Sequence, residues 1–172
     1  WISTRGASGD NLSPYSFFGY LCPDIVFFGS GGHHSDGGGE KDALRDARAT
    51  GVFCVNAVPW RMRLAMSGSA AEAAKNVDEF ELPTVPESLN GSSMSKGNCK
   101  LINAPYVANA GMHLECKVLE FVTLNEEDHA VVVIGRVILA EGDLEGTPVA
   151  ARGGYMNYFC IGPEHICSTH RL

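Results

Sequence analysis

The sequence predicts a mainly β domain with few helices, in which long antiparallel strands form part of a barrel wall. In residues 112–119, Met, Leu, Cys and Val occupy one face of an extended chain, while His, Glu, Lys and Leu occupy the other. This alternation is typical of a half-buried strand. A polar turn at residues 125–128 leads into residues 129–140, which are rich in Val and Ile, so the two segments are expected to form a long antiparallel hairpin.

The remaining elements follow from local patterns. Residues 25–28 and 52–58 are apolar enough to form two further strands. Residues 41–50 contain good helix formers, and Gly51 is placed to end that helix in a left-handed conformation. A second helix is expected over residues 60–75, weakened or divided by Ser-Gly-Ser at residues 67–69. Residues 83–105 are rich in turn formers, which predicts an excursion over the surface.

Length and composition predict one domain that spans residues 1–172. A chain of 18.4 kDa with 45% hydrophobic and 19% charged residues is ordinary for a soluble globular protein with one core. The net charge of -7 argues against a nucleic-acid partner, because phosphate backbones are held by clustered Lys and Arg. No apolar run approaches the roughly 20 residues of a membrane-spanning helix. We therefore expect a cytoplasmic protein that binds neither nucleic acid nor membrane.

The cysteines are expected to be reduced. Cys54 and Cys116 fall inside apolar strand patterns, where a free thiol behaves as a small hydrophobic group. Disulfides are rare in the cytosol, although Cys160 and Cys167 remain candidates for a bridge in an oxidising compartment. The two other cysteines are Cys22 and Cys99.

We expect no metal site. His33, His34 and Asp36 lie in a glycine-rich loop without a second ligand cluster at a suitable spacing. Three further histidines are expected to be exposed to solvent: His113, His165 and His170. The sequence also lacks the motifs of a nucleophile elbow, a Walker loop and a zinc protease, so no catalytic residue is named.

Two segments favour a phosphate-bearing aromatic cofactor. Residues 11–18 place short polar groups, a proline-fixed bend and several aromatic side chains within a short length of chain. Lys41 stands where a run of three glycines, residues 37–39, becomes a helix. A helix N-terminus offers unpaired N–H groups and the positive end of the helix dipole to a phosphate. Ser30, after the strand at residues 25–28, is placed to donate its hydroxyl to the same phosphate. The alternatives are a flexible glycine loop and a packed aromatic cluster, with one of Phe17 and Phe18 in the core.

The same segments carry a family resemblance. Residues 1–4, 11–18 and the helix start at residue 41 resemble those of the flavin reductase-like, FMN-binding split-barrel family. Residues 50–56 resemble a Thr-Gly-Glu-Phe-Val-Val-Asn strand of that family, and residues 149–158 resemble its closing segment. The matches occur in family order over nearly the whole chain. The resemblance implies an antiparallel, Greek-key split β-barrel, with an N-terminal strand that is incomplete here.

The resemblance also implies a set of cofactor-binding residues. These are Asn11, Leu12, Ser13, Pro14, Tyr15, Ser16, Phe17, Ser30, Lys41, Asp42, Ala43, Arg152 and Tyr155. The sequence departs from the family where Ala43 replaces a common Thr and Asp46 a frequent Asn. Loss of one neutral hydrogen bond costs about 0.5–1.5 kcal/mol, so we expect FMN affinity to fall roughly tenfold at most.

The resemblance to flavin reductase-like proteins also suggests a function for this chain. The resemblance implies an FMN-binding oxidoreductase, an NAD(P)H-dependent flavin reductase that passes electrons to free flavin or to a partner monooxygenase. It also implies a homodimer with FMN near the subunit boundary. The cofactor carries the redox chemistry, so no acid/base pair is required. The alternatives are an FMN-binding electron-transfer or sensor protein without nicotinamide turnover, and a barrel that has lost its flavin.

Overall fold

A computed structural model describes residues 1–34, 39–71, 73–74, 77–82 and 94–142 in full, and the main chain of three further strands at residues 149–152, 157–161 and 166–171. The strands and helices are, in chain order, β1 Ile2–Gly6, β2 Gly9–Ser13, β3 Phe18–Cys22, β4 Ile25–Ser30, α1 Asp42–Thr50, β5 Val52–Asn56, η1 Trp60–Met62, α2 Arg63–Gly68, β6 Lys96–Asn98, β7 Pro105–Val107, β8 Met112–Asn125, β9 Ala130–Gly142, β10 Val149–Arg152, β11 Asn157–Ile161 and β12 Ile166–Arg171. The predicted mainly β architecture is confirmed.

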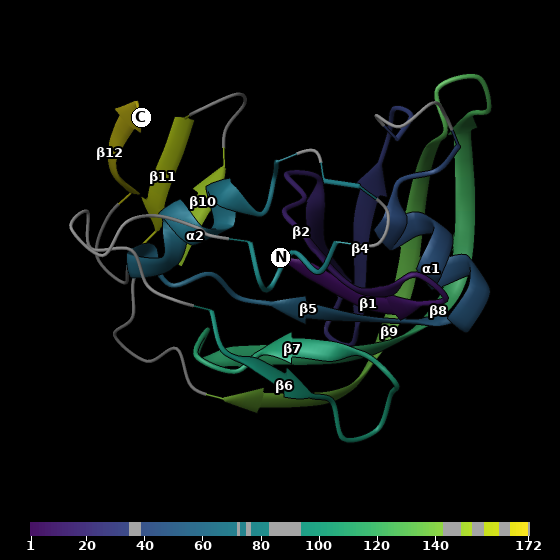
Figure 1. The fold of residues 1–172 in the computed structure, drawn as a ribbon, viewed down its shortest axis with the longest axis horizontal. Helices are drawn as coiled ribbons and strands as arrows, with labels where there is room; N and C mark the ends of the chain where they lie inside the picture. The colour runs from purple at the N-terminus through teal and green to yellow at the C-terminus, as the bar shows by residue number, and fades with distance from the viewer. Residues whose placement is uncertain are drawn as a thin grey trace.

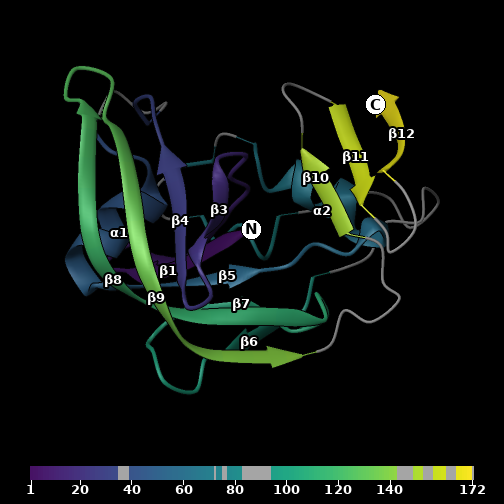
Figure 2. The same cartoon turned by 180° about the vertical axis from the view of Figure 1, so that it is seen from behind.

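Seven strands form one antiparallel sheet in the order β2-β1-β5-β8-β9-β4-β3. The hairpin of β8 and β9 is its longest part and curves from the level of β6 and β7 up past α1 (Figures 1 and 2). The sheet's concave side holds the main core, which includes Phe28, Phe53, Leu114 and Cys116. A smaller sheet of β10, β11 and β12 lies beside α2, away from that hairpin (Figure 1).

Helix α1 packs against β1 and β5. It ends as predicted, because Gly51 takes a left-handed φ of 71° and donates its N–H to the Ala47 carbonyl at 2.9 Å. The second predicted helix is much shorter than residues 60–75. It consists of η1 and α2 and ends at Gly68, within the Ser-Gly-Ser break.

A short hairpin covers the outer face of the sheet. Its strands β6 and β7 pair from Lys96↔Val107 to Asn98↔Pro105 and lie below β5 in Figure 1. Ser3 and Asn56 tie this hairpin to the sheet: Ser3 Oγ donates to the Pro105 carbonyl at 2.7 Å, and the Val107 N–H donates to Asn56 Oδ1 at 2.7 Å. The sequence pattern did not predict these strands. Among the described helices, none is long and apolar enough to cross a membrane.

Candidate functional site

The end of β4 and the start of α1 meet at the predicted phosphate site. Ser30 is the last residue of β4, and two residues later Gly32 donates its N–H to the Asp128 carbonyl at 2.7 Å. The Lys41 side chain passes over Gly32, where an added Cβ would lie 4.0 Å from Lys41 Nζ. The structure therefore brings the Lys41 side chain close to Gly32, two residues after Ser30.

The N-terminus of α1 has unpaired main-chain donors. Lys41 is the residue before the helix, has an extended conformation and gives no capping hydrogen bond from its side chain. The N–H groups of Asp42, Ala43 and Leu44 have no partner within the described residues, and the Lys41 ammonium forms no ion pair there. The first N–H groups of any helix lack intrahelical acceptors, so this end of α1 can receive an anion.

Neighbouring side chains engage the acidic groups of α1. Asp42 lies 3.2 Å from His34 Nε2 and accepts a hydrogen bond from Arg45. Arg45 also donates to Asp46, which accepts from Thr4 Oγ1 at 3.0 Å as well. Burial raises the pKa of Asp46 despite these bonds. Asp42 is thus occupied by protein partners and offers a ligand its N–H rather than its carboxylate.

Ala43 contributes through its main chain. Its methyl group is fully buried in the main core, on the side of α1 that packs against the sheet. A Thr side chain at this position would have to fit the same apolar space. The Ala43 N–H group, which has no partner among the described residues, is what this residue can offer a ligand.

Tyr15 and Ser30 form the floor of the site. The Tyr15 ring packs on Phe28 with 5.0 Å between ring centres, and burial raises the pKa of Tyr15 to about 12. Ser30 is only 5% exposed, and its Oγ has no hydrogen-bond partner in the described part of the chain. The Ser30 hydroxyl lies near enough to Tyr15 to oppose that rise in pKa, but the two groups do not meet hydrogen-bond geometry. A buried, unpaired hydroxyl is costly, and a ligand oxygen would satisfy it.

The rest of the segment from residue 11 divides between buried and exposed positions. Asn11 and Leu12 are buried, and the Leu12 N–H donates to Glu79 Oε2 at 3.1 Å. Ser13 donates to Asn11 Oδ1 at 3.3 Å, and Pro14 is partly buried. Residues 11 and 12 therefore belong to the support of the site.

The aromatic residues that follow lie at the surface. Ser16 is exposed, and Phe17 is 76% exposed while its carbonyl accepts the Gly29 N–H at 2.7 Å. Phe18 is 37% exposed. The expectation that one of these two phenylalanines lies in the core is wrong, because they adjoin β3, the last strand of the sheet, where no further strand covers them. Phe28 takes the core position instead.

Two predicted site residues belong to the closing segment of the chain, of which the structure describes only the main chain of three strands. Arg152 ends β10, where its main chain pairs with Tyr158 of β11. Tyr155 lies outside the described residues, as do His165 and Asp36. Cys160 and Cys167 are register partners in β11 and β12, and a bridge between them in an oxidising compartment stays a candidate.

The sequence pattern missed a buried polar cluster on β8. His113 is 6% exposed, so the expectation that it lies at the surface is wrong. Glu115, two residues later, is fully buried. Both occupy the face of β8 that the alternation marked as polar, and the segment around β6 and β7 covers that face (Figure 1). Nothing local to residues 112–119 signals this cover.

Glu79 is a second functional group that the pattern missed. Burial raises its pKa to about 7, while the N–H of Leu12 donates to its carboxylate. This acid therefore stands directly behind the strand that leads into the candidate site. Its place in a polar stretch of the sequence gave no sign of burial.

Comparisons with known proteins agree with this architecture. The chain belongs to the flavin reductase like domain family, whose sequence model matches residues 1–158. An uncharacterized protein of Deinococcus radiodurans is 28% identical over 145 residues, which cover 80% of this chain and 58% of that protein. The chain therefore spans less than two thirds of the length of this relative.

Solved structures of low sequence identity share the fold. Nitrilotriacetate monooxygenase component B from Bacillus cereus has a TM-score of 0.74 and 20% identity, over 95% of this chain and 83% of that one. The NADH:FAD oxidoreductase SgcE6 of Streptomyces globisporus C-1027 has a TM-score of 0.67 and 16% identity, over 99% of this chain and 82% of that one. The predicted split-barrel fold is confirmed.

Proposed function

We propose that this chain binds FMN and acts as an NAD(P)H-dependent flavin reductase that passes electrons to free flavin or to a partner oxygenase. One observation carries the proposal: the start of α1 offers N–H groups without a partner, the Lys41 side chain reaches Gly32, and the buried, unpartnered Ser30 hydroxyl belongs to the residue two positions before Gly32. All three are donors without acceptors among the described residues. A phosphate ester supplies acceptor oxygens and negative charge, so it fits this donor set.

The aromatic segment completes the proposed cofactor site. With the phosphate at α1, the isoalloxazine would lie along residues 13–17, where main-chain groups can meet its polar edge and Tyr15 and Phe17 can meet its apolar surface. Phe17 is the more exposed of these two side chains. When bound, FMN supplies the hydride-accepting chemistry, and the chain holds and orients it. Arg152 and Tyr155 remain proposed contacts from the closing segment.

The names of the fold relatives support the redox assignment. One relative is a monooxygenase component B, and the other is an NADH:FAD oxidoreductase. The first supports a partner monooxygenase, and the second supports a nicotinamide donor. The four described cysteines, Cys22, Cys54, Cys99 and Cys116, are free thiols, which supports a reducing, cytoplasmic location.

A comparison of FMN with riboflavin tests the phosphate site. Lys41→Ala should weaken FMN binding by about 10- to 100-fold, because a hydrogen bond to a charged group contributes roughly 1.5–3 kcal/mol. Riboflavin lacks the phosphate, so its affinity should change little. Binding is followed by quenching of flavin fluorescence, with FAD as a third ligand. Lys117→Ala, at an exposed position on β8, is the matched control. Equal losses for FMN and riboflavin would remove Lys41 from the phosphate site.

Rapid mixing of the FMN-loaded protein with NADH or NADPH tests the reductase step. We expect the absorbance of oxidised flavin to disappear in a single anaerobic turnover. Flavin that stays oxidised with both nucleotides would favour the electron-transfer or sensor alternative. A protein that takes up no flavin at all would contradict the proposal and support the barrel without a cofactor.

A further inference from the structure

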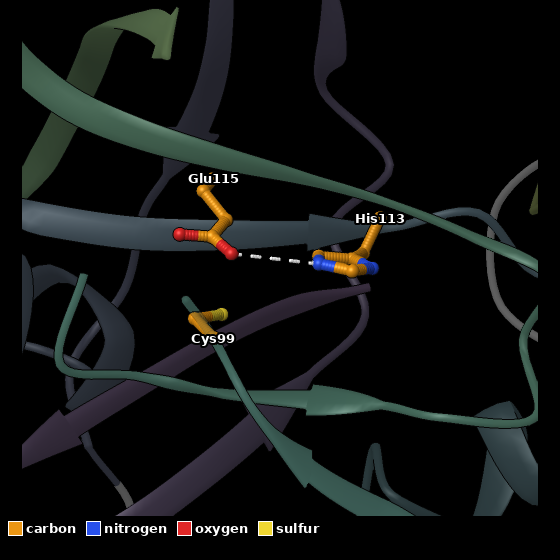
Figure 3. Close-up of side chains that lie close together, drawn as sticks. All are labelled: Cys99, His113 and Glu115. Carbon is orange, nitrogen blue, oxygen red and sulfur yellow. Dashed lines mark ion pairs between the residues drawn. The ribbon is translucent and has the colours of Figure 1, made fainter. Parts of the chain in front are cut away.

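A second group of chemically active side chains lies on the outer face of β8. Cys99 follows β6, while His113 and Glu115 point from β8 toward it (Figure 3). One sulfur, nitrogen or oxygen atom from each residue lies within 4.8 Å of the others. This face of β8 is opposite to Leu114 and Cys116, which belong to the main core. The group is therefore separate from the proposed flavin site.

The Glu115 carboxylate is fixed by main-chain donors. The Lys100 N–H donates to Oε1 at 2.7 Å, and the N–H groups of Leu101 and Ile102 donate to Oε2 at 2.7 and 3.2 Å. Each carboxylate oxygen can accept two bonds. Oε1 accepts one hydrogen bond from the described residues, and His113 Nε2 lies 3.6 Å from this oxygen (Figure 3).

His113 has an unpartnered nitrogen inside this group. Its side chain is 7% exposed, and Nε2 has no hydrogen-bond partner among the described residues. The ring is held by Tyr106, which stacks on it with 4.0 Å between centres and an angle of 18°. Gly97 makes room for Tyr106, because a Cβ there would lie 2.5 Å from the Tyr106 ring. Tyr106 thus holds the ring, while no described group forms a hydrogen bond with Nε2.

We propose that Cys99, His113 and Glu115 bind a zinc ion. Thiolate, imidazole and carboxylate are all zinc ligands, and bond lengths of about 2.0–2.3 Å place tetrahedral ligand atoms about 3.3–3.6 Å apart. The 3.6 Å between His113 Nε2 and Glu115 Oε1 is too long for a hydrogen bond and suits two such ligands. The Cys99 sulfur lies within 4.8 Å of the other two ligand atoms and would have to move closer to complete the set.

The fourth position is open to water or to Glu141. Glu141 Oε2 lies 3.8 Å from His113 Nε2, at the partly exposed side of the group. Its other oxygen pairs with Lys100. On binding, the Cys99 thiol gives up its proton, so one thiolate and one carboxylate offset the two charges of the ion. A neutral set of this kind is suited to a buried position.

The ion would act as a structural clip. Cys99 lies just after β6, and the two other ligands belong to β8, so the bonds to zinc would fasten the β6–β7 hairpin to the barrel wall. The alternative is an ion pair between protonated His113 and Glu115 with no metal. The zinc site and the ion pair both use His113 and Glu115, but only the zinc site requires the Cys99 sulfur.

Metal titration of the full 172-residue chain tests the proposal. The chain, stripped with a chelator, should bind one zinc ion in competition with a chromophoric chelator, and Co²⁺ in its place should give a thiolate-to-metal absorption band. Loss of an outer partner alone lowers metal affinity about 10- to 100-fold, so Cys99→Ser should lower zinc affinity at least about 100-fold and abolish the band. Cys22→Ser, which removes an exposed thiol elsewhere, should change neither.

Thermal unfolding with and without zinc distinguishes loss of zinc binding from a folding defect of the variant, because each variant is compared with itself. Zinc should raise the Tm of the wild-type chain and of Cys22→Ser but not of Cys99→Ser, because only a ligand that binds the folded state stabilises it. Mg²⁺ should have no effect, since a thiolate site does not suit a hard cation. A wild-type chain that binds no zinc would overturn the proposal. Equal zinc binding by Cys99→Ser and Cys22→Ser would also overturn it. That result is expected if His113 and Glu115 form a metal-free ion pair and zinc binds adventitiously elsewhere on the chain.

Discussion

At the scale of single residues, Glu79 links the candidate flavin site to pH. It is 6% exposed, and burial raises its pKa from 4.5 to about 7. The folded state therefore holds a proton on Glu79 in a pH range where the unfolded chain has lost it. Its carboxylate accepts a hydrogen bond from the Leu12 N–H. Ionisation of Glu79 therefore changes a contact of β2, the strand that leads into the site.

We predict that the free energy of unfolding falls as the pH rises from about 4.5 to 7. In this window the folded state binds more protons than the unfolded state, because the pKa of Glu79 is higher in the folded state. The stabilising contribution of protonated Glu79 is therefore fully present below pH 4.5 and is lost as the pH rises through 7. The free energy of unfolding should fall by about 1–3 kcal/mol over this range. Glu79→Gln should flatten this fall while Glu81→Gln, at an exposed position, should not. Urea unfolding at a series of pH values measures the free energy of unfolding of each variant. The same dependence on pH for Glu79→Gln and Glu81→Gln would show that Glu79 is not the cause.

At the scale of elements, β8 changes its surroundings along its length. Residues 113–116 are buried on both faces, by the main core on one side and by the β6–β7 segment on the other. Beyond Lys117 the strand is largely exposed. Next to this change, Gly135 of β9 leaves space for the Phe53 ring, because a Cβ there would lie 2.5 Å from that ring and 3.3 Å from the Lys117 carbonyl.

We predict that Gly135→Ala destabilises the protein by about 1–3 kcal/mol, the usual cost of overpacking a filled core. Phe53 is fully buried and packs on Phe28, so its ring has no free space to enter. Gly31→Ala is the matched control, since a Cβ there would meet only Ala130 at 4.0 Å. Midpoints of urea unfolding compare the variants, and equal midpoints would show that the Phe53 ring moves at no cost.

The sequence predicts an element well when the residues that determine it lie within the element itself. The β8–β9 hairpin and α1 were predicted because alternation, helix formers and Gly51 lie within the segments themselves. The second helix was overextended because its end depends on how the chain after Gly68 packs. His113 was misplaced because its cover comes from residues 96–107, and no pattern within β8 reports that contact.

The candidate site shows the same division. Ser30 and Lys41 were named from their positions at the end of a strand and the start of a helix, and the structure confirms that Ser30 ends β4 and that Lys41 directly precedes α1. The polar cluster on β8 could not be found in this way, because Cys99 reaches it only through the fold. Its spacing in the sequence resembles no known metal motif.

At the scale of the whole molecule, the seven-stranded sheet ends at β3 with apolar side chains exposed. Tyr20 and Leu21 are 57% and 58% exposed, and Phe17 lies just before the strand. Exposed apolar patches of this kind mark interaction sites. A second copy of the chain would cover them, in agreement with the proposed homodimer and with FMN near the subunit boundary.

We predict that the chain sediments at twice its mass of 18.4 kDa. Leu21→Lys should shift it toward the monomer, because a charge at this position must be desolvated in the interface. Leu124→Lys, which alters an exposed side chain at the end of β8, should leave the mass unchanged. Sedimentation velocity distinguishes these results, and a wild-type chain that stays at 18.4 kDa with flavin bound would contradict the dimer.

Helix α1 begins without a capping side chain, since Lys41, the residue before its first turn, contributes no capping hydrogen bond. In most helices a Ser, Thr, Asp or Asn closes that end, and its removal costs about 1 kcal/mol. In the proposed complex the cofactor phosphate takes over this task. Bound flavin would then stabilise the first turn of α1, so the cofactor would contribute to the stability of the fold in addition to its redox role.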